Sequence, residues 1–247
     1  PPETPARHKQ EWTDQARDHH DPAPGQPEDL SRMHRPLPLN EVVPGRAAFR
    51  CQRQPCATKA AGSSLKTLVY GSLEDSPQGH RRIIEYYISD ADRANSYLKV
   101  AFVRNPWDRL LSAHNYLMTS HERAPRDIQF AVSHLKQKGD FEEFVLALGK
   151  YPIYRRAVLS FAHFLPQNQY ICLPGQKGHS MDFLGRFERI VEDTEELKRR
   201  LGIKDSGALP RVRTSNRQGY RDSYSDKMRD LVSQIYARDI EIFGYSF

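Results

Sequence analysis

The chain has 247 residues, of which 38% are hydrophobic and 28% charged, and its formal net charge is +6. This length suits one domain of about 200 residues with a tail, and three cysteines are too few for a disulfide-built scaffold. No window approaches the ~18 consecutive apolar residues of a membrane-spanning helix, and the positive charge favours anionic partners such as phosphate groups, nucleic acid or an acidic polysaccharide.

The first 42 residues differ in composition from the rest of the chain. They are rich in Pro, Asp, Glu, His and Arg and poor in large aliphatic residues, so they cannot bury enough surface to offset the entropy of ordering. We therefore predict a flexible stem or tail over residues 1–42 and a folded domain over residues 43–247. A helix packed on the domain around residues 11–19 is the alternative. The chain does not begin with Met and has no secretory signal pattern, as expected of a fragment that has lost a targeting or membrane segment.

A loop of small residues precedes a helical pattern that begins near residue 65. The loop consists of Thr58, Lys59, Ala60, Ala61, Gly62, Ser63 and Ser64. Small residues let the backbone approach an anion, serines add hydroxyl donors and lysine adds a compact charge. The alternative is an ordinary helix start. No Gly-Lys-Ser/Thr triplet occurs, which argues against a nucleoside triphosphatase or kinase.

The next element is an apolar run over residues 97–104, which predicts a buried strand of a parallel sheet. Asn105 and Pro106 then suit the N-cap and first position of a helix that we expect to extend to residue 118. Arg104 stands at the carboxyl end of the strand, where open α/β sheets bind their ligands, and Ser112 follows two turns into the helix. The alternative is that Arg104 only pairs with an acidic neighbour.

The remaining pattern alternates helices and strands. Residues 83–88 suit either a strand or a helix. Helices are predicted over residues 141–148, 154–163, 194–201 and 225–242, and strands over residues 170–173 and 183–189. This alternation predicts an α/β fold with a mainly parallel sheet flanked by helices.

Two of these segments resemble parts of a known family. The segment Arg104-Asn-Pro-Trp-Asp-Arg-Leu-Leu-Ser112 resembles the one with which sulfotransferases hold the 3'-phosphate of 3'-phosphoadenylyl sulfate (PAPS). The loop at residues 58–64 resembles their 5'-phosphosulfate loop, although Thr58 stands where the family usually has Pro. Residues 183–193 and 236–247 are similar to segments of its carbohydrate-modifying branch, so the resemblance covers roughly residues 47–247.

The resemblance implies a P-loop-like sulfotransferase fold and transfer of a sulfuryl group from PAPS to a carbohydrate hydroxyl, with no metal required. Lys59 would stabilise the leaving oxygen, because such transfer depends on fixed donors around developing charge. The implied cofactor-binding residues are Thr58, Lys59, Ala60, Ala61, Gly62, Ser63, Ser64, Arg104, Asn105, Trp107, Ser112 and Arg213.

The acceptor hydroxyl must lose a proton, and histidine is a natural base near neutral pH. His80 lies between the two PAPS segments, where some carbohydrate members have their catalytic histidine, so it is the first candidate. His163 resembles another family element but could equally be a core histidine. Glu74 and His114 are further candidates.

An arginine-rich stretch at residues 209–220 predicts a loop. In the family a comparable segment closes over the nucleotide, so Arg213, Ser215 or Arg217 could meet a phosphate or an anionic acceptor. A solvated basic loop is the alternative.

Two other functions stay open, namely a silent family member that binds PAP or a glycan without turnover, and a basic nucleic-acid-binding protein. No nucleic-acid-binding motif is present, so no nucleic-acid partner is expected. The expected partner is a glycan or other hydroxyl acceptor, possibly anionic.

The stem predicts a type II membrane protein of the Golgi lumen, attached only through a segment outside this chain, whereas a bacterial protein would be cytoplasmic.

Overall fold

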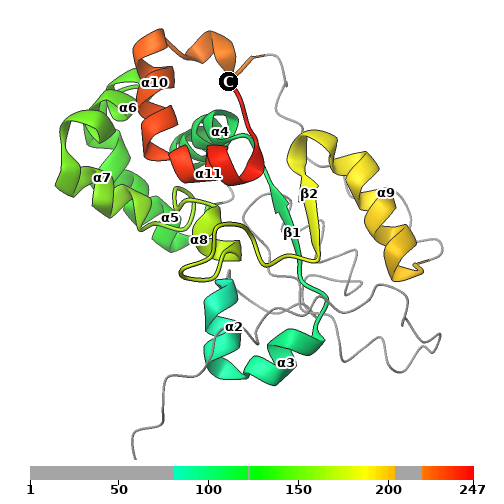
Figure 1. Cartoon of the computed structure of the whole chain (residues 1–247). Coiled ribbons are helices and arrows are strands. Elements are labelled where there is room, and N and C mark those ends of the chain that lie inside the picture. The colour runs from blue at the N-terminus through cyan, green and yellow to red at the C-terminus, as the bar shows by residue number, and fades with distance from the viewer. Residues whose placement is uncertain (1–80, 122, 204–218) are drawn as a thin grey trace, which may run out of the picture. The chain divides into compact units, whose positions relative to one another are not determined.

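The computed structural model describes residues 81–121, 123–203 and 219–247. The expected tail, the loop at residues 58–64, Glu74, His80 and the basic loop with Arg213 fall outside these ranges. The described part is a helix-rich α/β structure with a small parallel sheet (Figure 1).

Two parallel strands form the sheet within the described residues. Strand β1 (Val100–Val103) pairs with β2 (Phe183–Arg186), and the register places Val103 opposite Arg186. All four residues of β1 are buried, as expected for a strand covered on both faces. Both predicted strands are confirmed but are shorter than predicted, because β1 begins at Val100 and residues 187–189 form a helical turn after β2. Both strands end at the same edge of the sheet.

Helices make up most of the remaining described structure. They are α2 (Ile83–Ser89), α3 (Ala91–Ser96), α4 (Pro106–Thr119), α5 (Pro125–Phe130), α6 (Phe141–Lys150), α7 (Pro152–Leu159), α8 (Asn168–Ile171), α9 (Ile190–Leu201), α10 (Asp226–Ile235) and α11 (Ala237–Phe243). Other helical turns lie at Ala131–Leu135, Lys136–Lys138, Phe187–Arg189 and Arg221–Ser223. The predicted helices near residues 106, 141 and 194 are confirmed, and the segment for which strand and helix were both open is helix α2. No helix in the described ranges is both long and apolar enough to cross a membrane.

The start of α4 follows from its local sequence. The Asn105 side chain accepts hydrogen bonds from the backbone N–H groups of Trp107 at 3.1 Å and Asp108 at 3.4 Å. Pro106 occupies the first turn, where a missing N–H costs nothing. The strand therefore passes into the helix within three residues, which fixes the direction of side chains at the junction.

The predicted strand at residues 170–173 is wrong, because the chain forms helix α8 there. The carboxylate of Asp239 accepts hydrogen bonds from the backbone N–H groups of Gln167 at 2.7 Å and Asn168 at 2.8 Å. These are donors that a helix start leaves without intrahelical partners. A carboxylate distant in the sequence thus favours a helical turn where the apolar run alone suits a strand.

Two predicted helices differ from the observed ones in length. The helix expected over residues 225–242 divides at Tyr236, which leaves helical geometry with φ of −108° and ψ of 24°. Its buried ring packs in the core and its hydroxyl donates to the Phe164 carbonyl at 2.7 Å. The helix expected over residues 154–163 ends at Leu159, so His163 lies in the turn beyond it.

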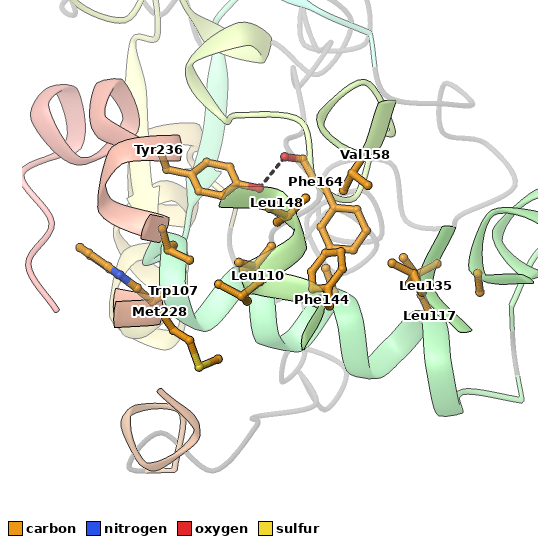
Figure 2. Packing of buried hydrophobic residues seen from close by; sticks show 14 of the residues in the cluster. Trp107, Leu110, Leu117, Leu135, Phe144, Leu148, Val158, Phe164, Met228 and Tyr236 are labelled. Carbon is orange, nitrogen blue, oxygen red and sulfur yellow. Dashed lines mark hydrogen bonds between the residues drawn. The ribbon is translucent and has the colours of Figure 1, made fainter. Parts of the chain in front are cut away.

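The larger hydrophobic core surrounds α4. It includes the buried side chains of Leu110, Leu117, Phe144 and Leu148, which join α4 to α6, and Val232 from α10 (Figure 2). Burial of a large aliphatic or aromatic side chain contributes roughly 1.5–3 kcal/mol. This packing fixes α4 and hence the residues at its N-terminus.

A second cluster joins the sheet to α9. It contains Phe102, Phe183, Ile190 and Leu197. Gly185 in β2 leaves room for the Phe102 ring, since a Cβ at this position would lie 2.4 Å from a ring carbon. The close approach of the two strands therefore depends on a residue without a side chain.

Candidate functional site

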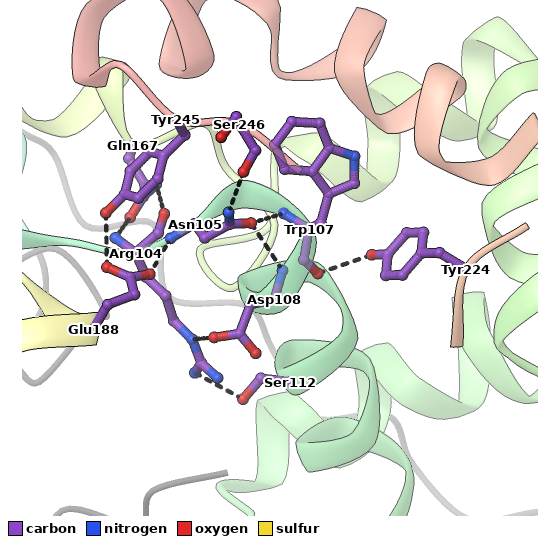
Figure 3. A network of polar contacts seen from close by, with 10 residues as sticks. All are labelled: Arg104, Asn105, Trp107, Asp108, Ser112, Gln167, Glu188, Tyr224, Tyr245 and Ser246. Atoms are coloured by element: carbon purple, nitrogen blue, oxygen red, sulfur yellow. Dashed lines mark hydrogen bonds and ion pairs between the residues drawn. The ribbon is translucent and has the colours of Figure 1, made fainter. Parts of the chain in front are cut away.

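Arg104 is the first residue after β1, at the carboxyl edge of the sheet. Its Nε donates to the Asp108 carboxylate at 2.6 Å and its Nη1 donates to the Ser112 hydroxyl at 3.0 Å (Figure 3). The guanidinium carbon also lies 4.4 Å from the centre of the Phe187 ring, which follows β2. The structure thus brings together two of the predicted site residues, Arg104 and Ser112, and adds an acidic partner, Asp108.

The main chain of Arg104 is held by the side-chain amide of Gln167. The Arg104 N–H donates to Gln167 Oε1 at 2.9 Å, and Gln167 Nε2 donates to the Arg104 carbonyl at 2.8 Å. Gln167 is fully buried, with 0% of its surface exposed. The sequence analysis missed this residue, because it is 63 positions from Arg104 and belongs to no motif that marks it.

Asn105 joins three distant segments of the chain. Its backbone N–H donates to Glu188 Oε1 at 2.6 Å, and its side-chain Nδ2 donates to the Ser246 carbonyl at 2.9 Å. Glu188 Oε2 in turn accepts from the Tyr245 hydroxyl at 3.0 Å. Three of the four segments that resemble the family in sequence are therefore neighbours in space, although neither Glu188 nor Tyr245 was singled out as a site residue.

Trp107, another predicted site residue, belongs to the core. Only 3% of its surface is exposed, its indole N–H donates to the Arg229 carbonyl at 3.0 Å, and its ring packs edge-on against Phe247. The side chain therefore holds the start of α4 against α10. Any part that Trp107 has in ligand binding comes from the position that it gives to this helix.

Burial shifts the pKa values of two groups near the site, Asp239 and Tyr245. Burial raises the pKa of Asp239, while the backbone N–H groups of Asn168 and Gln167 and the charge of Arg109 oppose this rise. Burial likewise raises the pKa of the Tyr245 hydroxyl, which stays protonated and acts as a donor to Glu188. The edge thus combines a guanidinium and a hydroxyl, which can donate to an anionic group, with carboxylates that hold the guanidinium and the nearby backbone in place.

The family model that matches this chain is that of the sulfotransferase family, and it covers residues 52–246. The match includes every segment of the network around Arg104. The chain belongs to the sulfotransferase family.

Two relatives of this sulfotransferase family member carry the name carbohydrate sulfotransferase 10. The protein of Xenopus laevis is 26% identical, and the match covers 77% of this chain and 64% of the relative. The protein of Gallus gallus is 28% identical, with 77% and 63% covered. The chain thus spans less than two thirds of the length of either relative. No solved structure matches the sulfotransferase chain significantly.

His163 is one of the proposed bases of this sulfotransferase chain and lies beside α4. Its Nε2 is 3.3 Å from Asp127 Oδ2, and its ring stacks on that of Tyr116 at 5.1 Å. Tyr116 follows Ser112 by one helical turn and therefore shares its face of α4. A carboxylate on one ring nitrogen is an arrangement that orients a histidine for proton transfer.

His114, the other described candidate, is a core residue of the sulfotransferase chain. Its ring lies 5.2 Å from that of Phe141 and 5.0 Å from that of Phe144, and 5% of its surface is exposed. Burial lowers its pKa. These surroundings suit a neutral packing residue and give an acceptor no access to the ring.

The described part of the sulfotransferase chain also contains metal-ligating types of side chain and a thiol. No group of three His, Cys, Asp or Glu side chains there could hold a metal ion. Burial raises the pKa of the Cys172 thiol to about 11, so it is protonated and unreactive at neutral pH.

Proposed function

We propose that the protein transfers a sulfuryl group from PAPS to a hydroxyl group of a carbohydrate. Membership of the family and the printed names of the two relatives support this activity. The observation that carries it is the pairing of Arg104 with Ser112, 3.0 Å apart, at the carboxyl edge of a parallel sheet. This is the edge at which α/β folds bind nucleotides.

The 3'-phosphate of PAPS is the group that we assign to Arg104 and Ser112. A guanidinium offers a planar fork of donors that matches phosphate oxygens, and the hydroxyl adds a donor beside it. Asn105 and Trp107 belong to this proposed site through the geometry of the strand-to-helix junction, and Arg213 would approach from the basic loop. Asp108 holds Arg104 in place and balances its charge before a phosphate binds.

The 5' side of the nucleotide is assigned to the loop at residues 58–64, which lies outside the described residues. Gly62, Ser63 and Ser64 would bind the 5'-phosphate, with Thr58, Ala60 and Ala61 completing the loop. Lys59 would stabilise the leaving oxygen as the sulfur–oxygen bond breaks. With the small parallel sheet, this loop would give the domain at residues 43–247 a P-loop-like sulfotransferase fold.

The acceptor loses its hydroxyl proton as its oxygen attacks the sulfur. His80 remains our first proposal for the base. His163 is the second, supported by its carboxylate partner and by its stacking on Tyr116, which lies one helical turn from Ser112. Deprotonation by a positioned base typically contributes 10²–10⁴-fold to the rate.

The expected acceptor is a carbohydrate, and the net charge of +6 favours an anionic one. We place the protein in the Golgi lumen as a type II membrane protein, with residues 1–42 as its stem. A cytoplasmic location applies if the source is bacterial.

Direct transfer is the main test of this function. The protein is incubated with PAPS that carries radioactive sulfur and with a panel of neutral and anionic glycans, and label in the glycan is measured. In parallel, thermal shift is recorded with PAP, with ATP and magnesium, and with duplex DNA. Stabilisation by PAP with transfer supports the proposal, PAP binding without transfer indicates a silent member, and stabilisation by DNA alone favours a nucleic-acid-binding protein.

Substitution of Arg104 tests the proposed phosphate site. Arg104→Ala removes charge-assisted hydrogen bonds worth about 1.5–3 kcal/mol each, so PAP affinity should fall by about 10- to 100-fold. Isothermal calorimetry measures this change. Arg199→Ala is the matched control, because Arg199 lies on the exposed face of α9 and pairs with Glu196. Equal affinity in wild type and Arg104→Ala would remove the assignment.

The two candidate bases are separated by their effects on turnover. His80→Ala and His163→Ala are compared for kcat and for PAP affinity. Substitution of the true base should lower kcat by about 10²–10⁴-fold with PAP affinity unchanged. The same substitution should remove the acidic limb of the pH–rate profile. A histidine whose loss changes neither kcat nor the profile is excluded as the base.

A further inference from the structure

Gln167 is the residue on which this inference centres. We propose that Gln167 is a positioning residue that fixes Arg104 for recognition of the nucleotide 3'-phosphate, and thereby a determinant of specificity for 3'-phosphorylated nucleotides. The inference rests on the proposed function and deepens it. Its basis is the pair of hydrogen bonds, 2.9 and 2.8 Å long, between the Gln167 amide and the main chain of Arg104.

The position of Arg104 in the strand explains why such support matters. The pairing of β1 with β2 ends at Val103, opposite Arg186. Arg104 therefore lies just beyond the ladder that holds the strand. The Gln167 amide offers one acceptor and one donor at the spacing of a backbone peptide, so it continues the strand-like hydrogen bonding by one residue.

Gln167 is itself held by a second buried group. Asp239 of α11 accepts hydrogen bonds from the backbone N–H groups of Gln167 and Asn168, and from the Asn168 side chain at 2.5 Å. Asp239 and Gln167 are both fully buried. The contacts from Asp239 through Gln167 to Arg104 thus anchor the proposed site to α11, because Asp239 lies 72 residues after Gln167 in the sequence.

The burial of Gln167 separates its role from direct binding. Gln167 has 0% of its surface exposed, so we expect it to act through Arg104 and not by contact with the ligand. Binding groups need to be held within about 0.5 Å of their working geometry by such supporting residues. Loss of Gln167 should therefore weaken the contribution of the 3'-phosphate and leave the rest of nucleotide binding unchanged.

The experiment compares two nucleotides that differ by the 3'-phosphate, PAP and adenosine 5'-phosphate. Their affinities are measured by calorimetry for wild type, Gln167→Met, Arg104→Ala and the double variant. Methionine keeps the approximate volume but makes neither hydrogen bond. Gln167→Met should lower PAP affinity by about tenfold, equivalent to ~1.4 kcal/mol, with adenosine 5'-phosphate affinity unchanged. In the double variant the effects should not add, because both act through one guanidinium.

A core variant controls for general loss of stability. Val158→Ala removes buried methyl groups in α7 and breaks neither hydrogen bond between Gln167 and Arg104, so it should leave the preference for PAP intact. If Gln167→Met does not fold, Gln167→Asn replaces it, because the shorter amide stays polar but cannot reach both Arg104 groups.

The outcomes distinguish this inference from the function on which it rests. A wild-type protein that binds the two nucleotides equally would contradict the proposed phosphate site itself. A wild type that prefers PAP, with Gln167 variants that keep the whole preference, would overturn the positioning role alone. A reduced preference in Val158→Ala of the same size would also overturn it, since the effect would then follow from stability.

Discussion

At the scale of single residues, the Arg104 guanidinium is already arranged before a ligand arrives. Asp108 and Ser112 occupy its Nε and Nη1, and the Phe187 ring lies against its face. The pair with Asp108 is mostly buried, with 10% and 15% of the two side chains exposed. A bound phosphate therefore meets a donor group whose rotamer is fixed, which lowers the entropic cost of binding.

His114 gives the residue-scale prediction. Burial lowers its pKa in the folded state, so below pH 6.5 the unfolded chain takes up a proton that the folded chain does not. Neutral His114 thus makes its full contribution to the free energy of unfolding above pH 6.5, and this contribution is lost as the pH falls below that value. The wild type should therefore lose unfolding free energy as the pH falls from about 7.5 to about 5.5, and His114→Met should lack that loss.

Urea denaturation at pH 7.5 and pH 5.5 measures the difference. His121→Met is the control, because His121 is exposed and its substitution removes a histidine without altering the core. The same pH dependence in His114→Met and wild type would show that His114 takes up its proton equally in both states.

At the scale of elements, local signals explain which parts of the fold were predictable. The junction of β1 and α4 combines an apolar run, a capping Asn and a Pro within a few residues, so the sequence alone predicts it. Helix α8 depends instead on the carboxylate of Asp239, and the division at Tyr236 depends on a hydrogen bond to Phe164. Such long-range contacts override short apolar patterns.

The candidate site likewise combines residues that the local sequence predicts with residues that only long-range contacts bring together. Arg104 and Ser112 are eight residues apart on one strand and helix, so their proximity follows from local geometry. Gln167 and Glu188 reach the same edge from 63 and 83 residues away. Only tertiary packing brings them there, and neither residue belongs to a sequence pattern that predicts its contact with Arg104 or Asn105.

The β1–β2 pair gives the element-scale prediction. An alanine Cβ at position 185 would lie 2.4 Å from a Phe102 ring carbon, so Gly185→Ala must displace the ring or the strand. Overpacking of this kind costs typically about 1–3 kcal/mol, which denaturant unfolding should detect. Gly178→Ala is the matched control, since nothing lies within 4 Å of the added methyl group. Equal stability of the two variants would mean that the strands can separate without cost.

At the scale of the whole described structure, one polar network connects segments that are far apart in the sequence. Asn105 contacts Glu188 and Ser246, and Glu188 contacts Tyr245. Arg186 also donates to the Phe243 carbonyl. The end of β1, the end of β2 and the segment after α11 therefore share their hydrogen bonds, and a ligand that fixes one should stabilise all three.

This coupling gives the last prediction, measured by hydrogen exchange with and without saturating PAP. If PAP binds at Arg104, amide exchange should slow together at residues 104–108, 186–190 and 239–246, because local opening of any of them breaks the shared network. Helix α6, residues 141–150, belongs to the core around α4 and takes part in none of the hydrogen bonds named above, so it should change little. Adenosine 5'-phosphate is the control ligand, since it lacks the group assigned to Arg104 and should protect the three segments less. Protection confined to residues 104–108 would contradict the coupling, because the contacts of Asn105 with Glu188 and Ser246 would then open independently of the ligand.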